Sequence, residues 1–197
     1  MDQAALLKTI AETGYNVGFG AKKHFATYDI VEKAPGWIGF VSIAVGIFGL
    51  VFEVLSSKVP SATLAVFGVG ALYITLYDKD KYEYDTAGKE LTRIFNALRD
   101  LYRSVQGGAD VQVAAAELKV LEQRYYDSCL SKQIALSDWY AHYKFFAQHQ
   151  IDWVEEQQKF RLWRDKVPLS ARILLLVMSV CAIGFAGVWL LEPLRRF

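Results

Sequence analysis

The stretch "GWIGFVSIAVGIFGLVFEVL", from Gly36 to Leu55, carries a single charged side chain, Glu53, close to its end. An α-helix needs roughly 20 mainly apolar residues to cross the hydrocarbon core of a bilayer. A second apolar run, "PSATLAVFGVGALYITLY" from Pro60 to Tyr77, carries no charge and is followed by "DKDK". We therefore predict two membrane-spanning helices within residues 36–78.

Only "SSKV" separates the two runs, so they must form an antiparallel helical hairpin. Trp37 begins the first run and Tyr77 ends the second, positions where aromatic side chains favour the membrane–water interface. We predict that both open ends of the hairpin lie at the same membrane surface.

A third apolar run, "ARILLLVMSVCAIGFAGVWLLEPL" from Ala171 to Leu194, predicts a third span. The sequence has 197 residues, is 53% apolar and has a mean hydropathy of +0.17. Burial in a soluble core is the alternative, but a chain of this size has too few other residues to cover three such helices. The predicted fold class is an all-α membrane protein.

Lysine and arginine predict the orientation, because they are enriched in cytoplasmic loops. The hairpin tip carries only Lys58, whereas the segments before and after the hairpin are rich in both residue types. The opening "MDQAALLKTIAETGYN" has no basic segment followed by an apolar core, unlike a secretory signal. We expect the N-terminus and the central helices to be cytoplasmic and the tip to lie outside.

Small residues recur in the spans at intervals that place several on one helical face. In lipid, such residues allow helix backbones to approach closely. They predict packing within the hairpin or between copies of the chain, and Glu53 is a candidate either for a pore or for simple contact with the interface. The hairpin candidates are Gly39, Gly46, Gly49, Glu53 and Gly68.

Residues 79–168 predict amphipathic cytoplasmic helices. Apolar positions from Thr86 to Gln106 follow a period of 3.6, "QGGAD" then breaks the helix, and Asp110 is a suitable N-cap for the next one. A later heptad-like pattern of aromatic residues predicts a seam that packs within the protein or against a partner. Its candidates are Trp139, Tyr143, Phe146, Trp153 and Phe160.

Several classes of function are disfavoured. The 22 Lys and Arg nearly balance the 21 Asp and Glu, so no basic field would attract nucleic acid. The two cysteines offer no disulfide framework or zinc spacing, and His142 and His149 lie too far apart along a helix to chelate one metal. No nucleotide-binding loop or nucleophile–base spacing occurs. We expect no metal, no cofactor and no enzyme activity.

The segment before the hairpin contains "YNVGFGAKKHFATYD", from Tyr15 to Asp29. Its glycine spacing does not match a phosphate-binding loop. We predict that Lys22 and Lys23 meet anionic lipid headgroups and that "EKAPGW" turns the chain into the first span. Residues 1–35 would thus form a cytoplasmic segment that leads into the membrane.

Together, "YNVGFGAKKHFATYDIVEKAPGWIGFVSIAVGI", "LYITLYDKDKYEY" and "GKELTRIFNALRDLY" resemble the SLATT domain. This is a bacterial two-transmembrane effector family associated with nucleotide-second-messenger and reverse-transcriptase defence systems. On this resemblance the chain is one SLATT-like unit, composed of residues 1–35, the hairpin 36–78, the helices 79–168 and a hydrophobic C-terminal helix 169–197. The third apolar run departs from a strict two-span pattern.

The resemblance implies a toxin-like effector in the bacterial inner membrane, held quiet until a sensor or regulator from its defence system triggers it. It would then form homo-oligomers and permeabilise or depolarise the membrane. The alternative is a membrane-anchored scaffold that recruits a partner protein through its cytoplasmic helices. The expected partners are the bilayer, further copies of the chain and a neighbouring sensor, without direct nucleic-acid binding.

Overall fold

The computed structural model describes residues 2–148, 151–161 and 165–191. Helices account for most of these residues and none of them lies in a strand, which confirms the predicted all-α class. The chain divides into two compact units, Met1–Gln158 and Lys159–Phe197. Each unit is described by itself.

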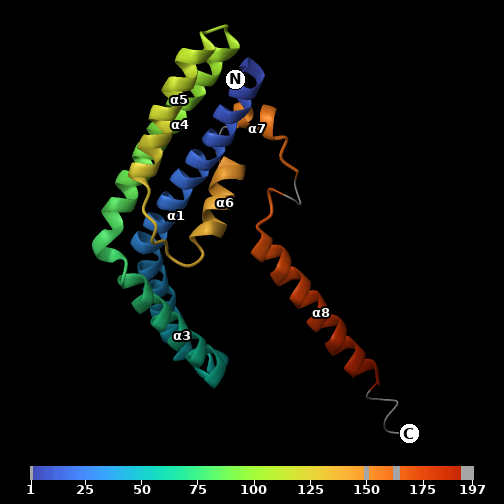
Figure 1. Cartoon of the computed structure of the whole chain (residues 1–197). Coiled ribbons are helices and arrows are strands. Elements are labelled where there is room, and N and C mark those ends of the chain that lie inside the picture. The colour runs from blue at the N-terminus through green and yellow to red at the C-terminus, as the bar shows by residue number, and fades with distance from the viewer. Residues whose placement is uncertain (1, 149–150, 162–164, 192–197) are drawn as a thin grey trace. The chain divides into compact units, whose positions relative to one another are not determined.

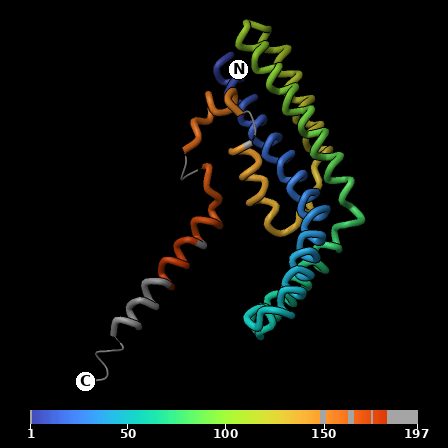
Figure 2. Tube along the Cα trace, turned by 180° about the vertical axis from the view of Figure 1, so that it is seen from behind, coloured from blue at the N-terminus to red at the C-terminus, as the bar shows by residue number. Residues whose placement is uncertain are grey.

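The first unit is organised around α1, which runs without interruption from Gln3 to Gly49. The Asp2 carboxylate caps its first turn by accepting a hydrogen bond from the Ala5 N–H at 2.7 Å. The turn expected at "EKAPGW" was wrong, because Pro35 lies inside this helix. An internal proline removes one backbone hydrogen bond and bends a helix, but it does not end a helix that is held on both sides. Both views show α1 changing direction part-way along (Figure 1, Figure 2).

The first half of α1 lies within a bundle of helices (Figure 1). Its partners are α4 (Lys81–Gln106), α5 (Val111–Ser128), α6 (Ser137–Gln148) and α7 (Asp152–Gln158). Burial of one apolar face per helix is the main force that stabilises such a bundle. The fully buried α1 side chains include Leu6, Ile10, Ala11, Val17, Ala26 and Thr27.

The predicted amphipathic helix is confirmed as α4. Its expected apolar face is buried, at Leu91, Ile94, Phe95, Leu98, Leu101, Tyr102 and Val105. The break follows at Gly108, whose φ of +91° suits a residue without a Cβ atom. Asp110 then caps α5 as expected, because its Oδ1 accepts hydrogen bonds from the N–H groups of Gln112 and Val113 at 2.8 and 2.9 Å.

The aromatic seam does not lie on one helix. Helix α6 ends at Gln148, residues 149–150 lie outside the described part, and α7 begins at Asp152. The buried positions of α6 are Ser137, Ala141 and Phe145, which are four residues apart and pack against α1. The buried face of α6 therefore differs from the predicted seam, whose α6 residues Trp139 and Tyr143 are exposed.

The predicted hairpin is present, with a shorter first arm than expected. Helix α1 ends at Gly49, a turn and the short helix α2 (Glu53–Ser56) form the tip, and α3 runs from Lys58 to Thr75. Residues 50–55 therefore belong to the tip and do not extend the first span. A 3₁₀ turn, η1 (Asp78–Asp80), connects α3 to α4.

The second unit contains α8, from Leu169 to Leu191. This helix covers the predicted third span from Ala171 onward, while residues 192–194 lie outside the described part. Its described side chains include exposed apolar ones, for example Leu176 and Val180. That α8 crosses a membrane stays a prediction.

The close approach of α1 to its neighbours at Gly18 generates a test. A Cβ atom added at Gly18 would lie 2.9 Å from ring atoms of both Phe95 and Phe145. We expect Gly18→Val to destabilise the bundle by about 1–3 kcal/mol, the usual cost of overpacking a core. Thermal unfolding in detergent measures this as a lowered Tm.

Gly46→Val is the matched control, because a Cβ atom at Gly46 would meet nothing within 4 Å. Its Tm should stay close to that of the parent protein. Equal losses of Tm in the two variants would contradict the packing of α1 described above.

Candidate membrane hairpin

The hairpin exposes an apolar surface that water cannot solvate favourably. Two helices of the described chain, α1 and α3, are long and apolar enough to cross a membrane by length and composition. Only 6% of the apolar window of each is buried inside the protein. The exposed side chains include Trp37, Phe40, Ile43, Ile47, Val66, Phe67, Val69 and Leu72. A continuous apolar surface of this kind is suited to lipid.

The hairpin glycines do not all face the same environment. A Cβ atom at Gly39, Gly46 or Gly68 would meet nothing within 4 Å, so these positions face away from the chain's own side chains. At Gly49 it would meet the backbone nitrogen of Ser56 at 3.7 Å. Only Gly49 among these predicted positions thus permits a close approach within the chain, at the tip.

Glu53 lies at the tip of the hairpin. It is the first residue of α2, and its side chain is exposed. A carboxylate at the end of a hairpin can reach water or headgroups, which lowers the cost of its charge near lipid. The structure therefore places Glu53 beyond the first span and outside its interior.

The open end of the hairpin joins the bundle through a small apolar cluster, which we call the junction cluster. Its buried members are Val31, Ile74, Tyr77, Tyr84 and Ile134. They come from α1, α3, the turn after α3, α4 and the loop before α6. Tyr77, predicted at the membrane interface, is only 7% exposed and belongs to this cluster, whereas Trp37 is 67% exposed.

The loop between α5 and α6, residues 129–136, is held at this end by side-chain hydrogen bonds; we call it the junction loop. The Leu130 N–H donates to Nε2 of His24 at 3.0 Å, and Thr27 donates to the side-chain oxygen of Gln133 at 2.6 Å. The Tyr84 hydroxyl donates to the carbonyl of Lys132 at 2.8 Å.

His24 is neutral in this arrangement. Its side chain is buried, Nε2 accepts from the Leu130 N–H, and Nδ1 lies 2.7 Å from the carbonyl of Gly20, to which it donates. Burial lowers the pKa of His24, and the nearby Lys23 ammonium acts in the same direction. Sequence reasoning missed this residue, although its position four residues after Gly20 and three before Thr27 places it on the buried face of α1.

The predicted interface lysines contact α6 and its neighbours. Lys23 pairs with Asp138 at 2.8 Å, and Lys22 is half-buried, with its pKa lowered by burial and by the Lys144 charge. Lys144 pairs with Asp29. A helix rises 1.5 Å per residue, so Lys22 lies roughly 20 Å along α1 from Trp37. That separation exceeds the headgroup layer of a bilayer, which is about 5–8 Å on each side.

The seam candidates are distributed over different environments. Trp139 is 38% exposed and Tyr143 57% exposed, whereas Trp153 is 6% exposed and packs on Phe95 and Tyr102. Phe146 is partly buried beside His142, and Phe160 belongs to the second unit. Phe145, outside the predicted seam, is the fully buried α6 ring and packs on Tyr15 and Phe19.

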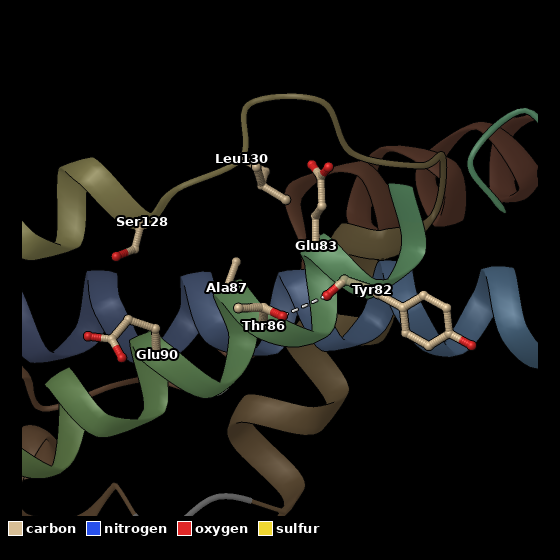
Figure 3. A pocket seen from close by; sticks show the side chains of 7 residues that line it. All are labelled: Tyr82, Glu83, Thr86, Ala87, Glu90, Ser128 and Leu130. Atoms are coloured by element: carbon tan, nitrogen blue, oxygen red, sulfur yellow. Dashed lines mark hydrogen bonds between the residues drawn. The ribbon is translucent and has the colours of Figure 1, made fainter. Parts of the chain in front are cut away.

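An open pocket of about 480 Å³ lies between α4 and the end of α5 (Figure 3). Its carboxylates, Glu83 and Glu90, point in different directions. Glu90 pairs with Arg124 at 2.6 Å and Arg93 at 3.2 Å, which lowers its pKa. A carboxylate held in this way is a weak base, so the pocket lacks the converging pair that acid–base chemistry uses. Within the described ranges, no group of three or more His, Cys, Asp or Glu could hold a metal ion.

Comparison with protein-family models places this chain in a described family. The family model described as "SMODS and SLOG-associating 2TM effector domain 6" matches residues 1–175. The match covers the helical bundle and both arms of the hairpin and ends within α8. Searches of curated proteins and of solved structures gave no match.

The lowered pKa of His24 predicts a dependence of stability on pH. In the unfolded chain His24 binds a proton near its ordinary pKa of about 6.5, whereas the folded chain binds it only at lower pH. The free energy of unfolding should therefore fall as the pH drops below about 6.5 and stay level above it. Burial opposes the charge of Asp29, but hydrogen bonds from Lys144 and Lys33 lower its pKa overall. Asp29 therefore changes its protonation only below about pH 4 and does not contribute to the pH dependence between about 5.5 and 7.5.

Thermal unfolding in detergent between pH 7.5 and about 5.5 measures this slope. His24→Gln should lower the Tm at every pH, because it disturbs two buried hydrogen bonds worth roughly 1–3 kcal/mol when lost. It should also flatten the slope. An unchanged slope in His24→Gln would assign the pH dependence to another group.

Proposed function

Since this chain belongs to the SLATT family of SMODS and SLOG-associating 2TM effector domains, a defence-associated family of membrane effectors, we propose that it permeabilises the bacterial inner membrane when triggered. Release would come from a sensor or regulator of the same defence system. The helical bundle would receive that signal, and copies of the hairpin would associate in the bilayer.

The observation that carries this proposal is the outward position of three hairpin glycines. At Gly39, Gly46 and Gly68, no atom of the described residues lies within 4 Å of the position that a Cβ would occupy, apart from the glycine's own helix backbone and chain neighbours. Gly39 and Gly46 are seven residues apart and share one face of α1. Small residues on an outer face allow another helix to approach closely in lipid. A two-helix hairpin is too small to enclose an aqueous path, so permeabilisation requires several copies.

We further propose that the chain acts without catalysis and binds no cofactor. The sequence offers no spacing of nucleophile and base, and the Glu90 carboxylate in the pocket beside α4 is paired with two arginines. A scaffold that recruits a partner is the competing function. The observation that favours it is the exposed Tyr143 ring on α6, which is 57% exposed and offers an aromatic contact to a partner.

Inducible expression in bacteria tests the effector function, with membrane potential and entry of an impermeant dye as readouts. We expect the intact protein, freed from its regulator, to collapse the potential. Gly46→Leu should preserve the potential at equal membrane abundance, because leucine blocks a close approach between copies at a position where an added Cβ meets no atom of the described chain within 4 Å. Ile47→Leu is the matched control, since Ile47 is 60% exposed one position further round the helix.

Full depolarisation by Gly46→Leu would exclude this face of α1 from the mechanism. Harmless expression of the intact protein, with a partner that co-purifies and no effect under phage challenge together with the neighbouring genes, would favour the scaffold.

The proposed topology has its own test. We expect the hairpin tip outside and the bundle in the cytoplasm, because lysine and arginine are concentrated away from the tip. On a Cys181→Ser background, an impermeant maleimide should label Ser57→Cys in intact spheroplasts. It should label the exposed Cys129 only after permeabilisation. The reverse pattern would invert the topology.

A further inference from the structure

The structure points to a second membrane contact, outside the two spans. We propose that the junction loop, residues 129–136, rests on the bilayer surface beside the hairpin. The side chain of Leu136 enters the lipid interface and anchors the loop there. This inference requires that the hairpin spans the membrane, but it does not depend on pore formation or on self-association.

The length of α3 places the loop at lipid depth. Helix α3 has 18 residues, from Lys58 to Thr75, and rises about 27 Å. The hydrocarbon core of a bilayer is about 30 Å thick, so α3 must use its whole length to cross it. Tyr73 therefore lies at the membrane boundary. The N–H of Ala135 donates a hydrogen bond to the Tyr73 hydroxyl at 3.4 Å.

Further contacts hold the loop against this end of the hairpin. Ile134 is 3% exposed within the junction cluster, and the Tyr77 hydroxyl donates to the carbonyl of Gln133 at 3.4 Å. The hydroxyl of Tyr84, on α4, donates a hydrogen bond to the carbonyl of Lys132. These contacts fix the loop backbone at the level where α3 ends, so the residue that follows Ala135 is presented at the same level.

Leu136 combines two features that the fold by itself does not favour. Its side chain is 70% exposed, and its φ is +68°, in the left-handed region where a branched side chain is strained. Glycine or asparagine would relieve that strain, and a polar residue would suit water. Contact with lipid would account for an exposed aliphatic side chain at this strained position.

The surroundings of Leu136 fit a lipid surface. The Lys132 ammonium lies 4.4 Å above the ring of Tyr77, at the end of the second span. A cation at this level meets lipid phosphates. This site is continuous with the lipid-facing surface of the hairpin, which selects the bilayer as its occupant.

The test measures the depth of residue 136 in vesicles of phosphatidylethanolamine and phosphatidylglycerol. Leu136→Cys, with both native cysteines changed to serine, is labelled with an environment-sensitive fluorophore. Lipids carrying a spin label near the headgroup end of the acyl chain serve as quenchers. Val113→Cys is the matched control, because Val113 is 68% exposed at the start of α5. The 26 residues of α4 separate that end of the bundle from the junction by roughly 39 Å.

We expect a blue-shifted emission at position 136 and quenching by the spin-labelled lipid at least several-fold greater than at position 113. Equal emission and quenching at the two positions would place Leu136 in water and overturn the proposal. A blue shift without quenching would place it against protein, such as a second copy, and would overturn it equally. Failure of depolarisation in the growth experiment leaves these readouts unaffected, so the two proposals are tested separately.

Leu136→Gly gives an independent measurement, because glycine accepts the left-handed φ. Its Tm in detergent should equal or exceed that of the parent, which shows that the loop still folds. In vesicles, the amides of residues 129–136 should exchange hydrogen at least several-fold faster than in the parent. Unchanged exchange would show that the leucine side chain does not anchor the loop.

Discussion

The continuity of α1 is the constraint on which the rest of this structure depends. One helix supplies the central element of the bundle and the first arm of the hairpin, so the two regions share a backbone. A helix is stiff along its axis, so the bundle contacts of residues 3–31 help to set the direction of residues 36–49. Pro35 lies between these parts and lacks the N–H that would complete the backbone ladder. It provides a place where the angle between the two halves can adjust without separating them.

The junction loop adds a second connection between bundle and hairpin. Its backbone is hydrogen-bonded to the side chains of His24, Tyr73 and Tyr84, which come from α1, α3 and α4. His24 is central because its neutral form offers one donor and one acceptor, both of which are used. The loop thus connects α5 and α6 to the end of the hairpin in addition to the connection through α1.

The outer surface of the hairpin, by contrast, has few partners in the chain itself. Large apolar side chains face outward between glycines that approach nothing, whereas the bundle glycines Gly18 and Gly88 lie tightly against aromatic rings. The same residue type thus has two uses. In the bundle it allows close packing within one chain, and in the hairpin it leaves space that lipid or another helix can occupy.

The sequence by itself determined the helical class, the two apolar arms, the amphipathic helix α4 and the cap at Asp110. These follow from local composition, from a period that one helix face must satisfy, and from the chemistry of a single turn. Only the tertiary structure decided that α1 passes through Pro35, because the contacts on both sides of the proline outweigh its local preference. It also decided that Ala141 and Phe145 are the buried positions of α6, that Tyr77 lies in a core, and that His24 holds a distant loop. Those outcomes depend on which surfaces meet across long separations in the chain, and no local pattern encodes that choice.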